Sequence, residues 1–237
     1  MTDHVLHVHY DQALIDLAQS YLPPLVGMAV PQKGMIHPDS ESTVVPLIEA
    51  LSRAHPEAKV GYWRARSWAL LCWQPIYLAM ICVYRLHAVP QGLSRIEQRR
   101  IGNSVAGYYL PKGDWYVSEN TEHCIVWSGE FITQLFRKLE SAIAKQVGGR
   151  GHYYKALLAD QVILVLEHVS TVYPELTYDW VISQYDLWRR SLVLPKIETA
   201  RFTLSTEQTY LRRSCCLQFR CANGELCSNC PRSNFRA

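Results

Sequence analysis

The chain has 237 residues, of which 49% are hydrophobic and 19% are charged. This composition excludes a disordered protein and is sufficient for a substantial hydrophobic core. The formal net charge of +3 is too small to indicate nucleic-acid binding. Residues 211–237 hold five arginines against one glutamate, so the whole positive excess lies in the C-terminal tail, which carries a net charge of +4.

Residues 1–10 alternate polar and apolar side chains and include three histidines, which predicts an exposed terminal strand. They lack the basic region, the apolar region and the small-residue cleavage site of a signal peptide. We therefore expect a cytoplasmic protein. Clustered cysteines in such a protein are more typical of metal or redox sites than of disulfides.

Three segments follow before the most apolar part of the chain. Residues 11–21 have a helical apolar period that ends before a Pro-Pro pair. Residues 25–45 include Pro31, Gly34 and Pro38 and have the composition of a loop. Residues 46–55 predict a helix with proline in its first turn.

The longest uncharged run, residues 67–84, is strongly apolar and lies inside a helical stretch over residues 57–86. Its 18 residues reach the minimum length of a membrane span. Gln74 and Pro75 interrupt its middle, however, because glutamine needs a polar partner and proline removes a helical hydrogen bond. We therefore predict two buried helices with a break near Pro75. The alternatives are a membrane span and a contact with the membrane surface.

The predicted strands lie in the middle of the chain, within residues 89–127. A turn at 89–92 precedes a helix expected from about Leu93. Residues 104–110 and 115–118 flank a Pro-Lys-Gly-Asp turn and predict a β-hairpin. Residues 124–127 are a candidate third strand.

Helical periodicity returns over residues 130–147, 152–172 and 177–194, with stops at glycine or proline and Thr177 as the N-cap of the last helix. The fold class is thus α+β, predominantly helical, with a small antiparallel β-sheet and a C-terminal cysteine-rich segment. We divide it into a body, residues 1–200, and a C-terminal segment, residues 201–237.

Five of the eight cysteines lie within 16 residues of the tail: Cys215, Cys216, Cys221, Cys227 and Cys230. An adjacent pair is followed after ten residues by a C-x2-C pair and then by a proline. Gly224 allows a tight return of the loop between the two pairs. The other three cysteines, Cys72, Cys82 and Cys124, lie in apolar surroundings typical of a core.

Three interpretations of the tail remain open. A [2Fe–2S] cluster needs four thiolates, and a C-x2-C pair followed by proline resembles ferredoxin motifs. A structural zinc ion also needs four ligands and often uses C-x2-C. Adjacent Cys215 and Cys216 fit a single ion less well, since neighbouring side chains in extended backbone point apart. The third interpretation is free or disulfide-bonded cysteines. The tail arginines suit either anionic metal–thiolate site and do not identify the metal.

Other candidates are weaker. Adjacent His123 and Cys124 rarely face each other as a nucleophile pair would require. Arg66 and Gln74 are polar residues in apolar surroundings that suit either a ligand or a structural role. Aromatic side chains suit either a ligand pocket or the core; these are Trp63, Trp68, Trp73, Tyr108, Tyr109, Trp115 and Tyr116. No dinucleotide fingerprint or P-loop motif is present, which argues against a reductase with its own nicotinamide or flavin.

The spacing C-C-x10-C-x2-C of Cys215, Cys216, Cys227 and Cys230 resembles the signature of the FhuF-type ferric siderophore reductases. The C-terminal position of the motif and the chain length agree with that family, and a tryptophan-rich stretch at 63–75 resembles it more loosely. The close resemblance covers about 16 residues of the chain.

The resemblance implies a [2Fe–2S] cluster bound by Cys215, Cys216, Cys227 and Cys230, with Cys221 outside the ligand pattern. It implies one-electron reduction of siderophore-bound iron(III), often hydroxamate-bound, at the cytoplasmic face of the inner membrane. The absence of dinucleotide and P-loop motifs points to an external electron donor, and the basic tail suits an acidic donor such as a ferredoxin-like protein. We expect a monomer that binds no nucleic acid, with peripheral membrane association. The resemblance assigns no substrate-binding residue, and we expect the siderophore to bind against the body, residues 1–200. The alternative function is a zinc-stabilised binding or adaptor protein without redox activity.

Overall fold

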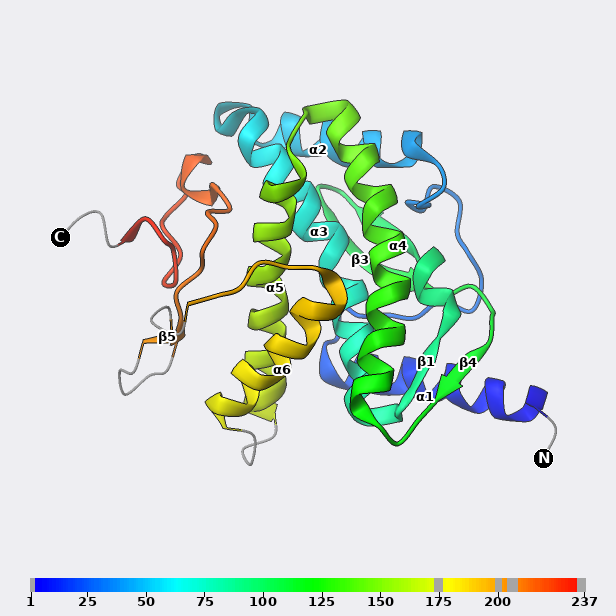
Figure 1. The fold of residues 1–237 in the computed structure, drawn as a ribbon. Helices are drawn as coiled ribbons and strands as arrows, with labels where there is room; N and C mark the ends of the chain where they lie inside the picture. The colour runs from blue at the N-terminus through cyan, green and yellow to red at the C-terminus, as the bar shows by residue number, and fades with distance from the viewer. Residues whose placement is uncertain (1–2, 173–176, 199–201, 204–208, 234–237) are drawn as a thin grey trace.

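The computed structural model describes residues 3–172, 177–198, 202–203 and 209–233. Within them, three long helices pack side by side: α3 (Lys59–Ile81), α4 (Thr121–Val147) and α5 (Gly151–Val172) (Figure 1). Helix α6 (Tyr178–Leu192) lies against α4 and α5, while α1 (Asp3–Tyr21) and α2 (Val45–Ala54) pack against α3. One hydrophobic core unites these helices. The predominantly helical α+β class is confirmed.

The strands form two-stranded antiparallel sheets. β1 (Ala88–Pro90) pairs with β4 (Trp115–Val117), β2 (Glu97–Ile101) pairs with β3 (Ser104–Tyr109), and β5 (Phe202–Thr203) pairs with β6 (Thr209–Tyr210). The predicted hairpin of β3 with β4 is therefore wrong. Instead, Gly102 and Asn103 form the two-residue connection of the β2–β3 hairpin, in which Ile101 pairs with Ser104.

Two further predictions in this region are wrong. The helix expected from Leu93 is only a 3₁₀ turn, Gln91–Arg95, because the chain then enters β2. The candidate strand at 124–127 is the beginning of α4. This helix starts early because Asn120 is its N-cap, with a side-chain oxygen that accepts a hydrogen bond of 2.8 Å from the Glu122 amide.

The predicted terminal strand is also wrong, since α1 is helical from Asp3 to Tyr21. Its contacts with the body explain its position. Tyr10 stacks on Trp115 at 5.2 Å between ring centroids, and Asp11 accepts a 3.0 Å hydrogen bond from the Trp115 indole. The helices predicted over 46–55, 130–147, 152–172 and 177–194 are confirmed, with ends shifted by a few residues and with a longer α4.

The predicted break near Pro75 does not occur, because α3 passes through Pro75 and continues into a π-helical turn, Cys82–Leu86. The Leu71 carbonyl, four residues before the proline, accepts a 2.9 Å hydrogen bond from the Gln98 side chain instead. The helical stretch Pro56–Leu86 is long and apolar enough to cross a membrane, but 67% of its most apolar window is buried inside the protein. Such burial is typical of a core helix.

Candidate metal centre

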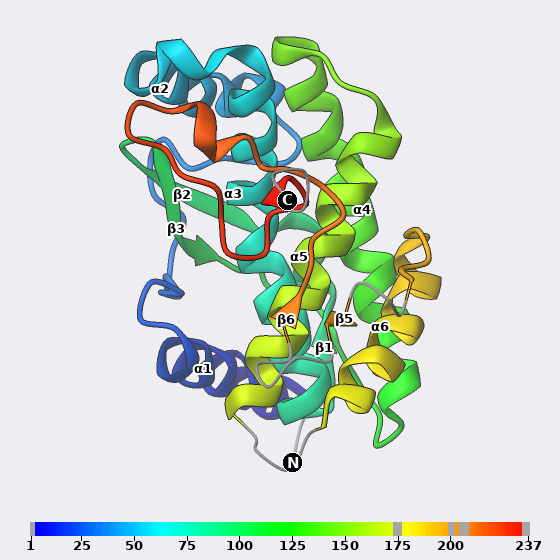
Figure 2. The same cartoon turned by 90° about the vertical axis from the view of Figure 1, so that its left-hand side faces the viewer.

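The cysteine segment, residues 209–233, lies across the surface formed by α3 and α5 (Figure 2). Asp160 of α5 fixes its beginning. The buried Asp160 carboxylate accepts hydrogen bonds from the Arg213 amide at 2.8 Å, the Ser214 amide at 2.7 Å and the Tyr210 hydroxyl at 2.6 Å, and also from the Ser214 hydroxyl. Cys215 follows directly, so a buried charge of the body positions the first cysteine.

Asp160 was missed by the sequence analysis. Its only signal is one acidic residue within the apolar stretch of residues 156–166. Burial of an ionised carboxylate is costly unless several donors surround it. Such a residue therefore indicates a segment elsewhere in the chain that supplies those donors.

The four cysteines of the predicted motif come together in two pairs. The sulfurs of Cys215 and Cys230 are 3.9 Å apart, and those of Cys216 and Cys227 are 3.7 Å apart. Two thiolates on one tetrahedral metal lie about 3.8 Å apart, given a metal–sulfur bond of about 2.3 Å. Each pair thus has the separation that one metal atom requires.

Each sulfur pair contains one of the two adjacent cysteines and one cysteine of the C-x2-C pair. The adjacent cysteines, Cys215 and Cys216, contact different partners, as expected for neighbouring side chains that point apart. The C-x2-C pair is divided in the same way, with Cys227 next to Cys216 and Cys230 next to Cys215. This arrangement of donors fits a cluster with two metal atoms better than one zinc ion held by the C-x2-C half-site.

Backbone and arginine donors surround these sulfurs. The Leu217 amide donates to the Cys215 sulfur at 3.4 Å, and the Arg212 guanidinium donates to the Cys216 sulfur at 3.7 Å. Burial raises the pKa of the Cys215 and Cys227 thiols. Burial also opposes ionisation of Cys216, but the Gln218 amide and Arg212 outweigh it, so the pKa of that thiol is lowered. The surroundings therefore favour the thiolate at Cys216 and the protonated thiol at Cys215 and Cys227.

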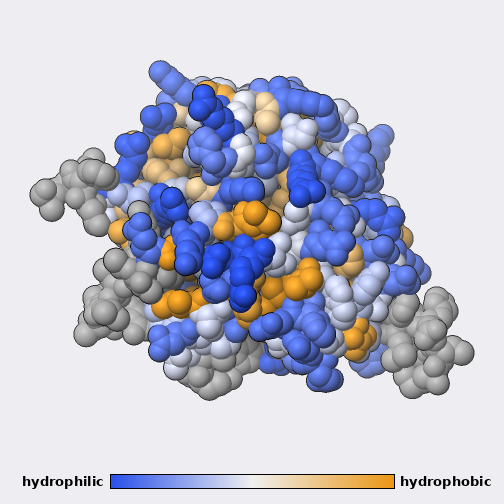
Figure 3. Space-filling view, viewed as in Figure 1, coloured by the Kyte–Doolittle hydropathy of each residue, from blue (hydrophilic) through white to orange (hydrophobic). Residues whose placement is uncertain are grey.

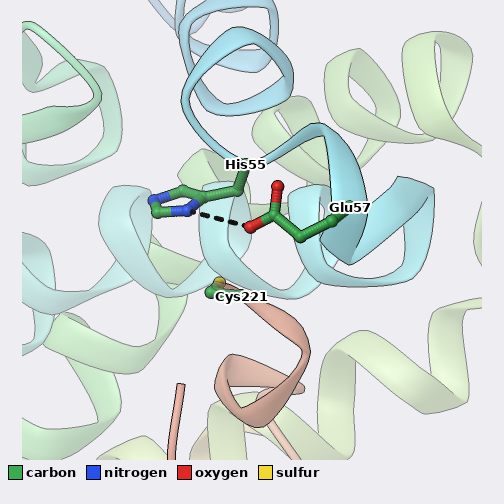
Figure 4. A group of neighbouring side chains, drawn as sticks. All are labelled: His55, Glu57 and Cys221. Carbon is green, nitrogen blue, oxygen red and sulfur yellow. Dashed lines mark ion pairs between the residues drawn. The ribbon is translucent and has the colours of Figure 1, made fainter. Parts of the chain in front are cut away.

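Cys221 lies apart from these pairs, at the corner between α2 and α3. Its sulfur, a His55 ring nitrogen and a Glu57 carboxylate oxygen lie within 4.8 Å of one another (Figure 4). Glu57 accepts a 2.7 Å hydrogen bond from the Ala222 amide and lies 3.8 Å from His55. The buried Cys221 also packs against Tyr62, whose pKa is raised to about 12 by burial and by a hydrogen bond with Cys221.

The loop of residues 217–226 is thus attached to the body by two contacts, that of Cys221 with Tyr62 and that of Ala222 with Glu57. The Tyr62 hydroxyl adds a 3.2 Å hydrogen bond to the Gln218 side chain. No local signal in the sequence predicts the contact between Glu57 and Ala222, since the two residues are 165 positions apart and neither belongs to a motif. It explains how an extra cysteine can lie inside the motif without joining the four paired sulfurs.

Most of the other residues that the sequence suggested for a functional site belong to the interior of the body. Cys72, Cys82 and Cys124 are buried, as predicted for core residues. Trp68 and Tyr108 are completely enclosed, while Gln74 donates a 3.0 Å hydrogen bond to Gln98. These side chains form the core of the body and its interior hydrogen bonds.

Residues 212–232 match the family model described as the FhuF 2Fe-2S C-terminal domain. This match covers all five tail cysteines and confirms the resemblance predicted from their spacing. The domain family is one that carries a [2Fe–2S] cluster, and the thiolate-rich donor set described above fits that cofactor. No solved structure matches the chain.

Proposed function

Because the chain carries an FhuF-type 2Fe-2S C-terminal domain, we propose that it is a ferric siderophore reductase. The observation that supports this proposal most directly is the pair of sulfur contacts within the matched segment. When bound there, the [2Fe–2S] cluster supplies single electrons for the reduction of iron(III). Iron(II) is softer and binds the oxygen ligands of a siderophore far more weakly, so reduction releases the metal.

We propose that the four cluster ligands are Cys215, Cys216, Cys227 and Cys230. In this assignment Cys215 and Cys230 bind one iron, and Cys216 and Cys227 bind the other. The sulfur separations of 3.9 and 3.7 Å support this division. Cys221 is not a ligand, in agreement with its position beside His55 and Glu57.

The chain's own residues make the site suitable for redox chemistry. A [2Fe–2S] centre with four thiolates is anionic, and reduction adds a further negative charge. Arg212 contacts the Cys216 sulfur, and its pKa is raised by Cys216 and Cys227 even though burial lowers it. Such a fixed positive charge, together with amide donors to the sulfurs, stabilises the reduced state and raises the reduction potential.

The finer parts of the proposal rest on the family resemblance. The substrate is a siderophore complex of iron(III), for which the resemblance favours the hydroxamate type. The protein acts in the cytoplasm, at the inner face of the inner membrane, as a monomer. An acidic ferredoxin-like protein donates electrons and docks on the basic C-terminal segment, since opposite charges accelerate encounter.

Anaerobic purification tests the proposal. We expect a brown protein with iron and acid-labile sulfide in equal amounts, whose reduced form is reoxidised by a ferric siderophore while a ferrous-selective chelator traps the product. Cys227→Ser should lose both the visible spectrum and the reduction. Cys221→Ser is the matched control and should keep both. A colourless protein that holds one zinc ion would overturn the proposal and leave the zinc-stabilised alternative.

A further inference from the structure

A cavity of about 680 Å³ lies beside the paired sulfurs, where the first turn of α5, the segment after α6 and the cysteine segment meet. Cys215 and Leu217 line one side, while Tyr153 and Lys155 of α5 line another. Its volume is in the range of cavities that hold small-molecule ligands, about 300–1,000 Å³. Hydrophobic patches lie among the hydrophilic residues on the surface near α5 and α6 (Figure 3). Val193, which lines the cavity, is 66% exposed.

The lining of this cavity is cationic. Lys155, Arg213 and Arg232 contribute three positive charges, and no acidic side chain occurs among the described residues that line it. The Arg232 guanidinium lies over the Phe219 ring, 5.1 Å from its centroid. Such stacking leaves the edge N–H groups of a guanidinium available to oxygen acceptors. The charge therefore complements an anionic ligand.

Tyr153 adds an unused hydrogen-bond donor. Among the described residues its buried hydroxyl has no hydrogen-bond partner, although buried hydroxyl groups nearly always have one. Burial raises the pKa of Tyr153, so the hydroxyl keeps its proton and stays a hydrogen-bond donor. The same residue is near enough to Cys215 and Cys216 for their charges to contribute to that shift.

We propose that this cavity is the substrate site and that, contrary to the hydroxamate type that the family resemblance favours, it selects iron(III) chelates of net negative charge, such as tris-catecholate complexes. This inference rests on the proposed reductase function and deepens it. Iron(III) with three hydroxamates is neutral, whereas iron(III) with three catecholates carries three negative charges. The three cations of the cavity attract the second class and leave the first almost unaffected, whereas the anionic cluster beside Cys215 repels the second class and offsets part of that attraction. Because Cys215 lines the cavity, a bound chelate is adjacent to one of the proposed cluster ligands.

Gallium(III) complexes test binding without electron transfer, because gallium(III) has the charge and coordination of iron(III) but is not reduced. The probes are gallium(III) complexes of a hexadentate tris-catecholate and of a hexadentate trihydroxamate, titrated calorimetrically into the cluster-loaded protein. We expect the anionic complex to bind at least about tenfold more tightly at low ionic strength, and this preference to decline with added salt. Equal affinities, or a preference unaffected by salt, would overturn the proposal.

Variants localise the site. Lys155→Gln should weaken binding of the anionic complex about fivefold and leave the neutral one unchanged. Lys33→Gln removes the same charge from an exposed residue outside the cavity and should change neither affinity. If Lys155→Gln and Lys33→Gln behave alike, the cavity is not the site.

These measurements separate the inference from the function on which it rests. If the reduced protein reduces ferric trihydroxamates but shows no preference for anionic gallium complexes, the reductase function stands and the charge selectivity fails. If anionic gallium complexes bind in the cavity and no ferric chelate is reduced, the binding site stands and the reductase function fails.

Discussion

The side-chain amide of Gln98 donates a 2.9 Å hydrogen bond to the backbone carbonyl of Leu71. In an uninterrupted helix that carbonyl would accept from the amide of residue 75, which is proline and has none. Gln98 also accepts a 3.0 Å hydrogen bond from Gln74, the residue before the proline. Gln98 thus provides a donor for the Leu71 carbonyl, which Pro75 leaves without its helical amide, and an acceptor for the side-chain NH2 group of Gln74.

We expect Gln98→Met to lower the free energy of unfolding by about 2 kcal/mol, because it leaves the Leu71 carbonyl and the Gln74 amide buried without partners. Denaturant unfolding measures the change. Gln12→Met, on the exposed face of α1, should change it by less than about 0.5 kcal/mol.

A double-mutant cycle sharpens this test. Pro75→Ala restores a backbone amide to the helix, so Gln98→Met should cost less in that background than in the parent protein. Equal costs in both backgrounds would show that Gln98 does not replace the missing helical bond.

Asp160 connects the body to the cysteine segment, and we expect Asp160→Asn to release that segment. An amide has only one acceptor oxygen and no charge, so it cannot replace the hydrogen bonds from Tyr210, Arg213 and Ser214. The loss is about 3 kcal/mol of local stability. Hydrogen exchange at the Ser214 amide and the rate of cluster loss should both increase.

Asp186→Asn is the control for this change. Asp186 is partly exposed and pairs with Arg189 and Arg190 within α6, so its replacement should affect neither measurement. Unchanged exchange at Ser214 in Asp160→Asn would contradict an anchoring role for the buried carboxylate.

Glu57 holds the loop between the cysteine pairs through the Ala222 amide. We expect Glu57→Ala to accelerate hydrogen exchange at Ala222 and to increase the rate of cluster loss on exposure to air. Glu57→Gln keeps a carbonyl acceptor and should have a smaller effect. Glu49→Ala, on the exposed side of α2, serves as the control. If Glu57→Ala matches Glu49→Ala in both measurements, the contact does not stabilise the loop.

The cysteine motif was predictable because its information is local. Four cysteines at fixed spacing restrict the chemistry of the tail whatever the body does. The helices over 130–147 and 152–172 likewise follow from periodicity and from the stops at Gly148 and Pro174. Pairing of strands is different. The pairing of β1 with β4 depends on contacts between residues distant in the sequence, such as Val89 and Tyr116, which are 27 positions apart. No local signal specifies these contacts.

The site residues that the sequence did not predict were missed for the same reason, because their contacts are distant along the chain. Asp160 and Glu57 become functional only through backbone amides that lie more than fifty positions away. The continuity of α3 was mispredicted for a related reason. Proline is a reliable helix breaker where no other donor replaces its amide, and the donor here comes from a strand whose position the sequence does not reveal.

Gly224 is the position where close approach, rather than a left-handed backbone, requires glycine. A Cβ there would lie 2.2 Å from the Gln218 carbonyl oxygen and 2.9 Å from that of Cys221. We therefore expect Gly224→Ala to open the loop, to separate Cys216 from Cys227 and to lower the iron and sulfide content of the purified protein by at least about half. Gly113→Ala is the matched control, because its Cβ would meet its nearest neighbour at an ordinary 3.5 Å. Full iron and sulfide in Gly224→Ala would show that the loop geometry does not control assembly of the site.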